Sequence, residues 1–125
     1  MKPESARVHV FPLQAGWTAR VGRSDADNDV LTFQEAFPQD LWLHVAGSPG
    51  SHVVLHHAGE RDPPRAVLEA AGQLAVRYSK SKNAKQASVT VARICDLQKP
   101  RGAPAGQVTV RRHKTLRIRM PEEQG

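Results

Sequence analysis

Three side chains with polar or aromatic chemistry alternate with apolar residues in one short segment. Asp40, Trp42 and His44 are two residues apart, so in a β-strand all three point to the same face. We expect an exposed or cleft-lining face, where Trp42 could stack on a base or a ribose. His52 follows a turn rich in glycine, proline and serine, and we expect it to lie near His44 across a hairpin.

Two roles are open for this hairpin. Asp40, His44 and His52 could form the acid/base set of a phosphodiesterase-like RNA-processing enzyme, because histidine titrates near neutral pH. The same residues could instead make structural hydrogen bonds that hold the turn. The turn itself, from Pro49 to His52, could offer backbone N–H groups and the Ser51 hydroxyl to a phosphate, although a plain hairpin turn has the same composition.

The sequence predicts no metal centre and no reactive thiol. It has several histidines but no CxxC or HExxH spacing, and zinc sites need four well-placed ligands. Asp25, Asp27 and Asp29 resemble half of a calcium loop that lacks its glycine and its final glutamate. The lone Cys95 lies in an apolar segment, where we expect it to be buried. We therefore expect no cofactor.

The positive charge is concentrated in the C-terminal half of the chain. Residues 1–76 carry six basic and nine acidic side chains, whereas residues 77–119 carry twelve basic side chains and the single acid Asp96. A field of one sign is typical of proteins that bind polyanions, and attraction to phosphate does not depend on base sequence. The distribution favours a nucleic acid as partner, with an idle basic surface as the alternative.

Length and composition indicate one globular domain. The chain has 125 residues, of which 39% are hydrophobic and 24% charged. No apolar stretch approaches the ~20 residues of a membrane helix, and the N-terminus lacks the apolar region of a signal peptide. We therefore expect a cytoplasmic protein without a membrane partner.

The hydrophobic pattern predicts an α+β domain over residues 6–120 with the order β-β-α-β-β-α-β-β-β. We expect a mainly antiparallel sheet with both helices on one side. The expected strands are 7–11, 17–21, 41–45, 52–57, 88–95, 107–110 and 115–118, and the expected helices are 28–36 and 63–78.

Several residues indicate where these helices begin and what they bury. Ser24 or Asp25 can cap the first helix, and Asp62 the second. Asn28 is expected to act as a cap, with nucleotide contact as the alternative. In the second helix, an apolar stripe runs from Val67 to Tyr78 and is expected to face the core.

Seven motifs, in order along nearly the whole chain, resemble the NFACT-R domain, formerly a domain of unknown function. They are VGRSDADNDVLT (21–32), DLWLHV (40–45), PGSHVV (49–54), LEAA (68–71), YSK (78–80), KPRGAPAG (99–106) and KTL (114–116). The resemblance implies RNA binding. In large members this domain is the C-terminal part of ribosome quality-control factors, which bind the split large ribosomal subunit and recruit tRNA.

The chain is too short for the other domains of those large factors, so it is more similar to stand-alone bacterial members of the family. We expect a non-enzymatic module for tRNA or rRNA, linked to ribosome-associated quality control or tRNA modification. The large ribosomal subunit or a tRNA-modifying enzyme could be a further partner. The candidate RNA-binding residues are Arg23, Asn28, Asp40, Trp42, His44, Ser51, His52, Tyr78, Lys80, Lys82, Lys99, Arg101, Arg112 and Lys114.

Overall fold

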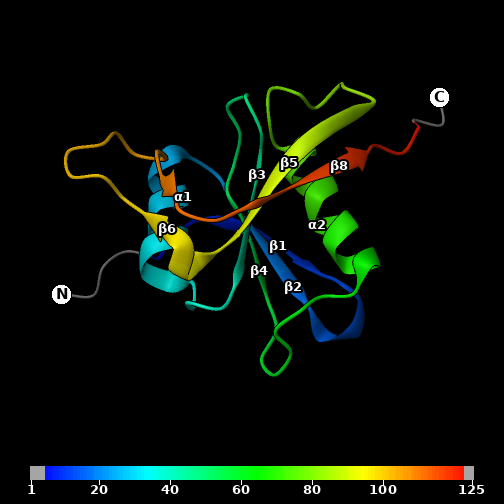
Figure 1. The fold of residues 1–125 in the computed structure, drawn as a ribbon, viewed down its shortest axis with the longest axis horizontal. Coiled ribbons are helices and arrows are strands. Elements are labelled where there is room, and N and C mark those ends of the chain that lie inside the picture. The colour runs from blue at the N-terminus through cyan, green and yellow to red at the C-terminus, as the bar shows by residue number, and fades with distance from the viewer. Residues whose placement is uncertain (1–4, 123–125) are drawn as a thin grey trace.

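Six antiparallel strands form the central sheet of the protein, which we describe over residues 5–122 of a computed structural model (Figure 1). Along the sheet their order is β1-β2-β4-β3-β5-β8. The strands are β1 (Val8–Pro12), β2 (Thr18–Gly22), β3 (Leu41–Val45), β4 (Val53–His56), β5 (Gln86–Arg93) and β8 (Lys114–Arg119). A separate two-stranded ribbon pairs β6 (Leu97–Gln98) with β7 (Thr109–Val110).

The helices lie between these strands in the chain. Helix α1 (Asp25–Val30) begins at Ser24, whose hydroxyl accepts a hydrogen bond from the backbone N–H of Asp27. A π-helical segment, Leu31–Glu35, continues it. Helix α2 (Arg65–Arg77) follows Pro64 and supplies the longest helical stretch. Ser24 is therefore confirmed as a cap, whereas the N-cap position of α2 is Pro64 and not the expected Asp62.

One face of the sheet packs against α2 and forms the larger core. Cross-strand pairs such as Leu41 with Leu55 and Leu43 with Val53 place apolar side chains on this face. Val67 and Ala71 of α2 cover them, at exposed fractions of 1% and 0%. Each fully buried valine or leucine contributes roughly 1.5–3 kcal/mol, so this larger core is the main source of hydrophobic stabilisation. The predicted core stripe of α2 is confirmed.

The opposite face of the sheet has a smaller core beneath α1 and the two-stranded ribbon. Trp42 is 3% exposed and packs with Ala92 and Leu97, and Phe33 of the π-helical segment lies against them. Figure 1 shows α1 and α2 on opposite sides of the sheet. The expectation that both helices share one side is wrong, because β3 carries buried apolar side chains on both of its faces. Leu41 and Leu43 face the larger core, and Trp42 faces the smaller one.

The α+β class, the antiparallel sheet and the order of the main elements are confirmed. Strand β6 adds one short element that the hydrophobic pattern did not predict. Cys95 is exposed, against expectation, because β5 ends at Arg93 and a 3-10 turn (Ile94–Asp96) carries the cysteine out of the sheet.

Candidate nucleic-acid interface

Two adjoining hollows near the C-terminal end of α2 share the side chain of Lys82. The first, of about 540 Å³, is also lined by Arg23 and Lys80. The second, of about 800 Å³, is also lined by Arg77, Lys85 and Arg119. We call these six side chains the cationic surface: Arg23, Arg77, Lys80, Lys82, Lys85 and Arg119. All six are exposed, and within residues 5–122 none makes an ion pair.

Backbone contacts between α2 and the turn before β4 position the first hollow. The N–H of Ser51 donates to the carbonyl of Tyr78 at 3.0 Å, and the N–H of Lys80 donates to the carbonyl of Pro49 at 3.0 Å. Gly50 is required here, because a Cβ atom would stand 2.7 Å from the Cβ of Ser79. The turn is thus held directly against the end of the helix.

Six of the predicted residues meet in this hollow. They are Arg23, Asn28, Ser51, Tyr78, Lys80 and Lys82. Tyr78 is half-buried, and its ring stacks on His9 with centroids 5.0 Å apart. Asp25 also lines the hollow and offsets part of its positive charge.

The turn does not offer the backbone donors that its composition suggested. The N–H of Ser51 is used by Tyr78, and the N–H of His52 donates to Oδ1 of Asn28 at 3.1 Å. Asn28 is 3% exposed and lies inside α1, so it fastens this helix to β4 and is not a cap. The exposed lysine and arginine side chains therefore carry the anion-binding capacity of the hollow.

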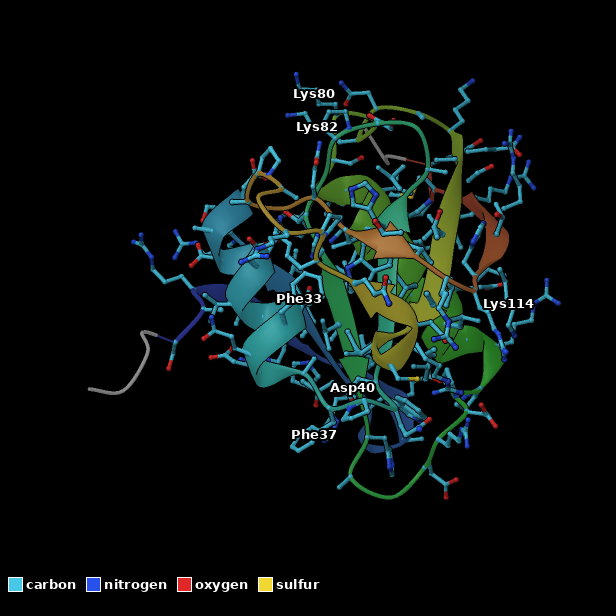
Figure 2. The ribbon with its side chains drawn as sticks, turned by 60° about the vertical axis from the view of Figure 1, so that its left-hand side comes forward. Phe33, Phe37, Asp40, Lys80, Lys82 and Lys114 are labelled. Carbon is cyan, nitrogen blue, oxygen red and sulfur yellow. The ribbon has the colours of Figure 1, made fainter. Side chains whose placement is uncertain are left out.

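Arg112 and Lys114 lie elsewhere, beside a third hollow of about 340 Å³ between α2 and β8. Figure 2 shows Lys80 and Lys82 together, with Lys114 at a separate edge and Asp40 at the far end. The predicted basic residues thus divide between separate places on the molecule.

Lys99 is engaged within the protein. Its ammonium group lies 3.1 Å from the Asp29 carboxylate and also donates to the carbonyls of Pro104 and Gln107. Arg101, two residues later, is exposed. We predicted that both residues of this loop contact RNA. The structure leaves Arg101 exposed for such a contact, whereas Lys99 is held by contacts inside the protein.

Trp42, His44 and His52 form a cluster in which Trp42 and His52 are buried and His44 is half-buried. The rings of His44 and His52 lie 5.9 Å apart, which confirms their predicted proximity across the hairpin. Trp42 stacks on His44 at an interplanar angle of 7°. The expected exposure of Trp42 is wrong, because Phe33 and the ribbon cover its face of the sheet.

Burial favours the neutral form of both histidines of the cluster by lowering the pKa of each. It lowers the pKa of His52 to about 4, opposed in part by a hydrogen bond to the backbone of Gly106. It also lowers the pKa of His44, against hydrogen bonds to the backbone of Gly50 and Val45. Both ring nitrogens of His52 are used inside the protein, one by Thr32 and one by Gly106.

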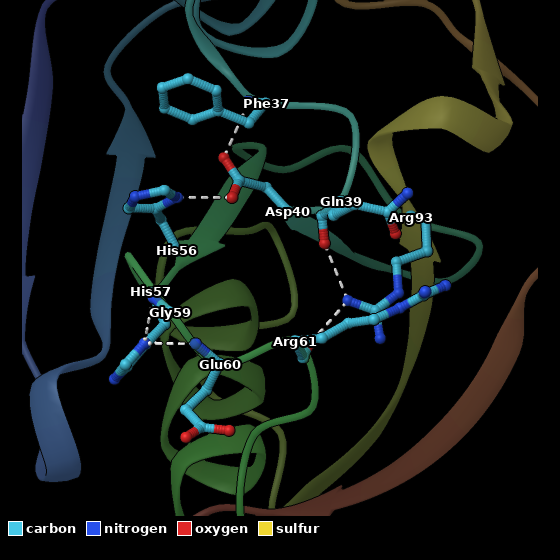
Figure 3. A network of polar contacts seen from close by, with 9 residues as sticks. All are labelled: Phe37, Gln39, Asp40, His56, His57, Gly59, Glu60, Arg61 and Arg93. Carbon is cyan, nitrogen blue, oxygen red and sulfur yellow. Dashed lines mark hydrogen bonds and ion pairs between the residues drawn. The ribbon is translucent and has the colours of Figure 1, made fainter.

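Asp40 belongs to a different network at the other end of β3 (Figure 3). Its carboxylate accepts from the N–H of Phe37 at 2.9 Å and lies 2.6 Å from Nδ1 of His56. The postulated acid/base set is therefore not assembled, because four residues of extended strand separate Asp40 from His44 by roughly 13 Å. Asp40 instead holds the segment before β3 against β4.

No helix within residues 5–122 is long and apolar enough to cross a membrane. Within the same range, no three side chains of histidine, cysteine, aspartate or glutamate gather as a metal site would need.

The predicted set omitted Arg77, Lys85 and Arg119. All three come from the basic segment 77–119, so the charge distribution included them. The sequence alone does not show that β5 pairs with β8. This pairing brings Arg119 opposite Gln86 and next to the end of α2.

Residues 7–112 match the family described as NFACT protein RNA binding domain. The chain is 39% identical over 98 residues to a protein of Streptococcus pneumoniae named Rqc2 homolog RqcH, and 32% identical over 108 residues to its namesake in Bacillus subtilis. These alignments cover 78% and 86% of this chain but only 17% and 18% of the relatives. The chain thus spans less than a fifth of their length.

A solved structure with the same fold comes from Streptococcus suis. It is described as the C-terminal of the fibronectin/fibrinogen-binding protein, and it superposes with a TM-score of 0.84 at 33% identity. The match covers 98% of this chain and 48% of that one. Together with the family match over residues 7–112, this likeness shows that the chain belongs to the NFACT-R family of NFACT protein RNA-binding domains.

Proposed function

We propose that the chain is a non-enzymatic module that binds structured RNA, with tRNA as the first candidate and rRNA as the second. The observation that carries this proposal is the cationic surface, in which two hollows share Lys82 and six exposed basic side chains lack ion-pair partners within residues 5–122. Such a surface suits the phosphate backbone, which supplies most of the affinity of a nucleic-acid complex.

The shape of the surface favours a folded RNA over an isolated phosphate. The basic side chains come from the turn before α1, from α2, from the loop before β5 and from the end of β8, so they can engage several phosphates of one backbone at once. Tyr78 adds an aromatic ring, and Ser51 a hydroxyl, at the edge of the first hollow. Shape and backbone contacts of this kind are how proteins recognise double-helical RNA.

The family supports the same ligand class and suggests a setting. Its description names RNA binding by NFACT proteins, and the relatives carry the names of a ribosome quality-control factor. We propose a link to that process or to tRNA modification, with the large ribosomal subunit or a modifying enzyme as the neighbouring partner. Because this chain covers so little of those relatives, their complete activity is not carried over.

The test is a titration of the full chain with tRNA and with rRNA fragments at salt concentrations from about 50 to about 200 mM. If every side chain of the cationic surface meets a phosphate, log affinity falls with log salt at a slope of roughly four to five. Lys82→Glu should weaken binding most, because Lys82 lines both hollows, and it should lower the slope by about one to two.

Arg65→Glu is the matched control, since it makes the same charge change at a side chain that is 92% exposed at the opposite end of α2. We expect it to weaken binding much less than Lys82→Glu. Equal effects of the two variants would contradict the location of the site. No binding to either RNA at about 50 mM salt would contradict the function. The bound RNA should be recovered intact on a denaturing gel, and cleavage would instead support an RNA-processing enzyme.

A further inference from the structure

The loop from Lys99 to Gln107 is built from two successive turns that project Arg101. The N–H of Ala103 donates to the carbonyl of Pro100 at 3.0 Å, with Gly102 at a φ of 77°. The N–H of Gln107 donates to the carbonyl of Pro104 at 3.2 Å, with Gly106 at a φ of 85°. Positive φ at the third position is what such turns require of glycine. Arg101 therefore occupies the exposed tip of the first turn.

One carboxylate ties the two ends of this loop together. Asp29 Oδ1 accepts from the N–H of Gly106 at 2.9 Å and from the Nζ of Lys99 at 3.1 Å. The same ammonium group donates to the carbonyls of Pro104 and Gln107, so it also fixes the second turn. Asp29 thereby holds a basic loop to α1, which is in turn fastened to β4 through Asn28 and His52.

The loop borders the first hollow of the cationic surface. A Cβ atom on Gly106 would stand 3.0 Å from Oδ1 of Asp25, and Asp25 lines that hollow. The loop that carries Arg101 is thus anchored beside the site proposed for RNA through its Gly106 end. A flexible loop would lose conformational entropy on binding RNA, and this loss would weaken the affinity. An anchored loop presents its arginine already in place and avoids most of that cost.

From this geometry we infer that Asp29 is a positioning residue for RNA binding, which acts by holding Arg101 in a preformed cationic loop. The inference rests on the proposed function. Simple electrostatics predicts the opposite effect on RNA affinity, because removing an acid from a protein that binds a polyanion should strengthen binding. Here, removing the Asp29 carboxylate weakens RNA binding.

The first experiment measures the anchoring without RNA. Trypsin does not cleave the bond between Lys99 and Pro100, so cleavage within the loop reports only on the bond between Arg101 and Gly102. Under native conditions Asp29→Ala should be nicked there several-fold faster than the unmodified chain, because the loop opens locally. Glu60→Gln, which removes the same charge from an exposed acid in the loop before α2, should be nicked at the unmodified rate.

The second experiment measures tRNA affinity of the same proteins. Asp29→Ala should bind about five- to tenfold more weakly, the size of one lost charge-assisted contact. Asp29→Asn keeps an oxygen acceptor for Gly106 and should show a smaller loss. Glu60→Gln, at an acid that lines none of the hollows, should bind as tightly as the unmodified chain. Thermal unfolding confirms that each variant is folded at the assay temperature.

A double-mutant cycle separates positioning from a general structural effect. Arg101→Glu should weaken tRNA binding in the unmodified chain and should have a much smaller effect in the Asp29→Ala background, because the arginine is no longer held in place. A merely structural role for Asp29 would leave the effect of Arg101→Glu unchanged and would overturn the inference.

Tighter or unchanged tRNA binding by folded Asp29→Ala would also overturn it. That failure differs from a failure of the proposed function, since Lys82→Glu would then still weaken binding. If Asp29→Ala weakens binding while Lys82→Glu does not, the positioning role stands and the cationic surface is misplaced. Should Asp29→Ala not fold, Asp29→Asn and the tryptic rate decide the question in the same way.

Discussion

His52 and Gly106 are joined by a hydrogen bond across 54 residues of sequence, with Nε2 of the imidazole 3.0 Å from the carbonyl oxygen. Because a carbonyl can only accept, Nε2 carries the proton. Nδ1 is then free to accept from the Thr32 hydroxyl at 2.7 Å. One neutral, buried imidazole thus connects β4, the segment after α1 and the basic loop.

The stability of the protein should therefore fall on acidification. Burial lowers the pKa of His52 from its ordinary 6.5 to about 4, so between these values the unfolded chain binds a proton that the folded protein does not. The free energy of unfolding should decrease by roughly 1.4 kcal/mol per pH unit in that window, about 3 kcal/mol in all. His44, whose pKa is also lowered, adds to the same dependence. Urea unfolding between pH 7 and pH 4 measures it.

His52→Gln should remove most of this dependence at the cost of stability at pH 7. His113→Gln, which replaces an exposed histidine in the turn before β8, is the control and should leave the pH profile unchanged. A profile of the same steepness in both variants would show that His52 is not its source.

A second prediction concerns Trp42, whose burial removes it from direct contact with RNA. Its indole Nε1 is buried without a hydrogen-bond partner in the described part of the chain, and its ring packs on Ala92 and Leu97. Trp42→Phe should lower the free energy of unfolding by about 1–2 kcal/mol through the lost packing volume. The tRNA affinity of the folded protein should not change. Weaker binding with an unchanged unfolding midpoint would mean that the tryptophan reaches the RNA.

The alternation in β3 predicted the right strand and the wrong exposure. Asp40, Trp42 and His44 do share a face, but a period of two cannot say whether the polar face is solvated or covered. It is covered here because Phe33 and the ribbon of β6 and β7 pack on it. Those segments follow or precede β3 by many residues, so the contact depends on tertiary packing alone.

The basic segment 77–119 supplies five of the six side chains of the cationic surface, whereas the motif residues Asp40, Trp42 and His44 lie outside it. The sequence predicts Lys80 and Lys82 in a basic loop, and the structure places them with Arg23 in one hollow. Lys99 looked equivalent in sequence, yet it lies against Asp29, 70 residues away. A lysine that neutralises a distant carboxylate has the same local sequence signature as one that is free, which is why only the fold separates them.

A third prediction uses the guanidinium of Arg93, which fastens the loop before α2 and the segment before β3 to β5 (Figure 3). Its Nη1 donates to the carbonyls of Gln39 at 2.8 Å and Arg61 at 2.7 Å, and its Nη2 pairs with Asp62. Lysine cannot reproduce this planar fork. Arg93→Lys should lower the free energy of unfolding by about 1–2 kcal/mol, as measured by urea denaturation.

Arg65→Lys is the matched control for that change. Arg65 also pairs with a carboxylate, Glu69, but it is 92% exposed and has no further partner of this kind in the described chain. Its replacement should shift stability by less than about 0.5 kcal/mol. Equal losses in the two variants would mean that the fork of Arg93 contributes nothing beyond an ordinary surface pair.

The fourth prediction concerns Gly72, where α2 passes directly over β8. A Cβ atom at this position would stand 2.5 Å from Cδ1 and 2.8 Å from Cγ1 of Ile118, which is 2% exposed. In an exposed helix Gly→Ala would stabilise by about 1 kcal/mol. Here the isoleucine is enclosed and cannot move away freely, so Gly72→Ala should instead lower the free energy of unfolding by about 1–3 kcal/mol.

A second substitution tests whether that contact is the cause. Ile118→Val removes Cδ1, the atom nearest the new methyl group, and alone should cost about 0.5–1.5 kcal/mol. Combined with Gly72→Ala it should make the alanine less costly than in the unmodified chain, because the closest overlap is gone. Thermal and urea unfolding of the four proteins give the coupling. Purely additive losses, or a gain in stability from Gly72→Ala alone, would show that α2 and β8 can separate without cost at this point.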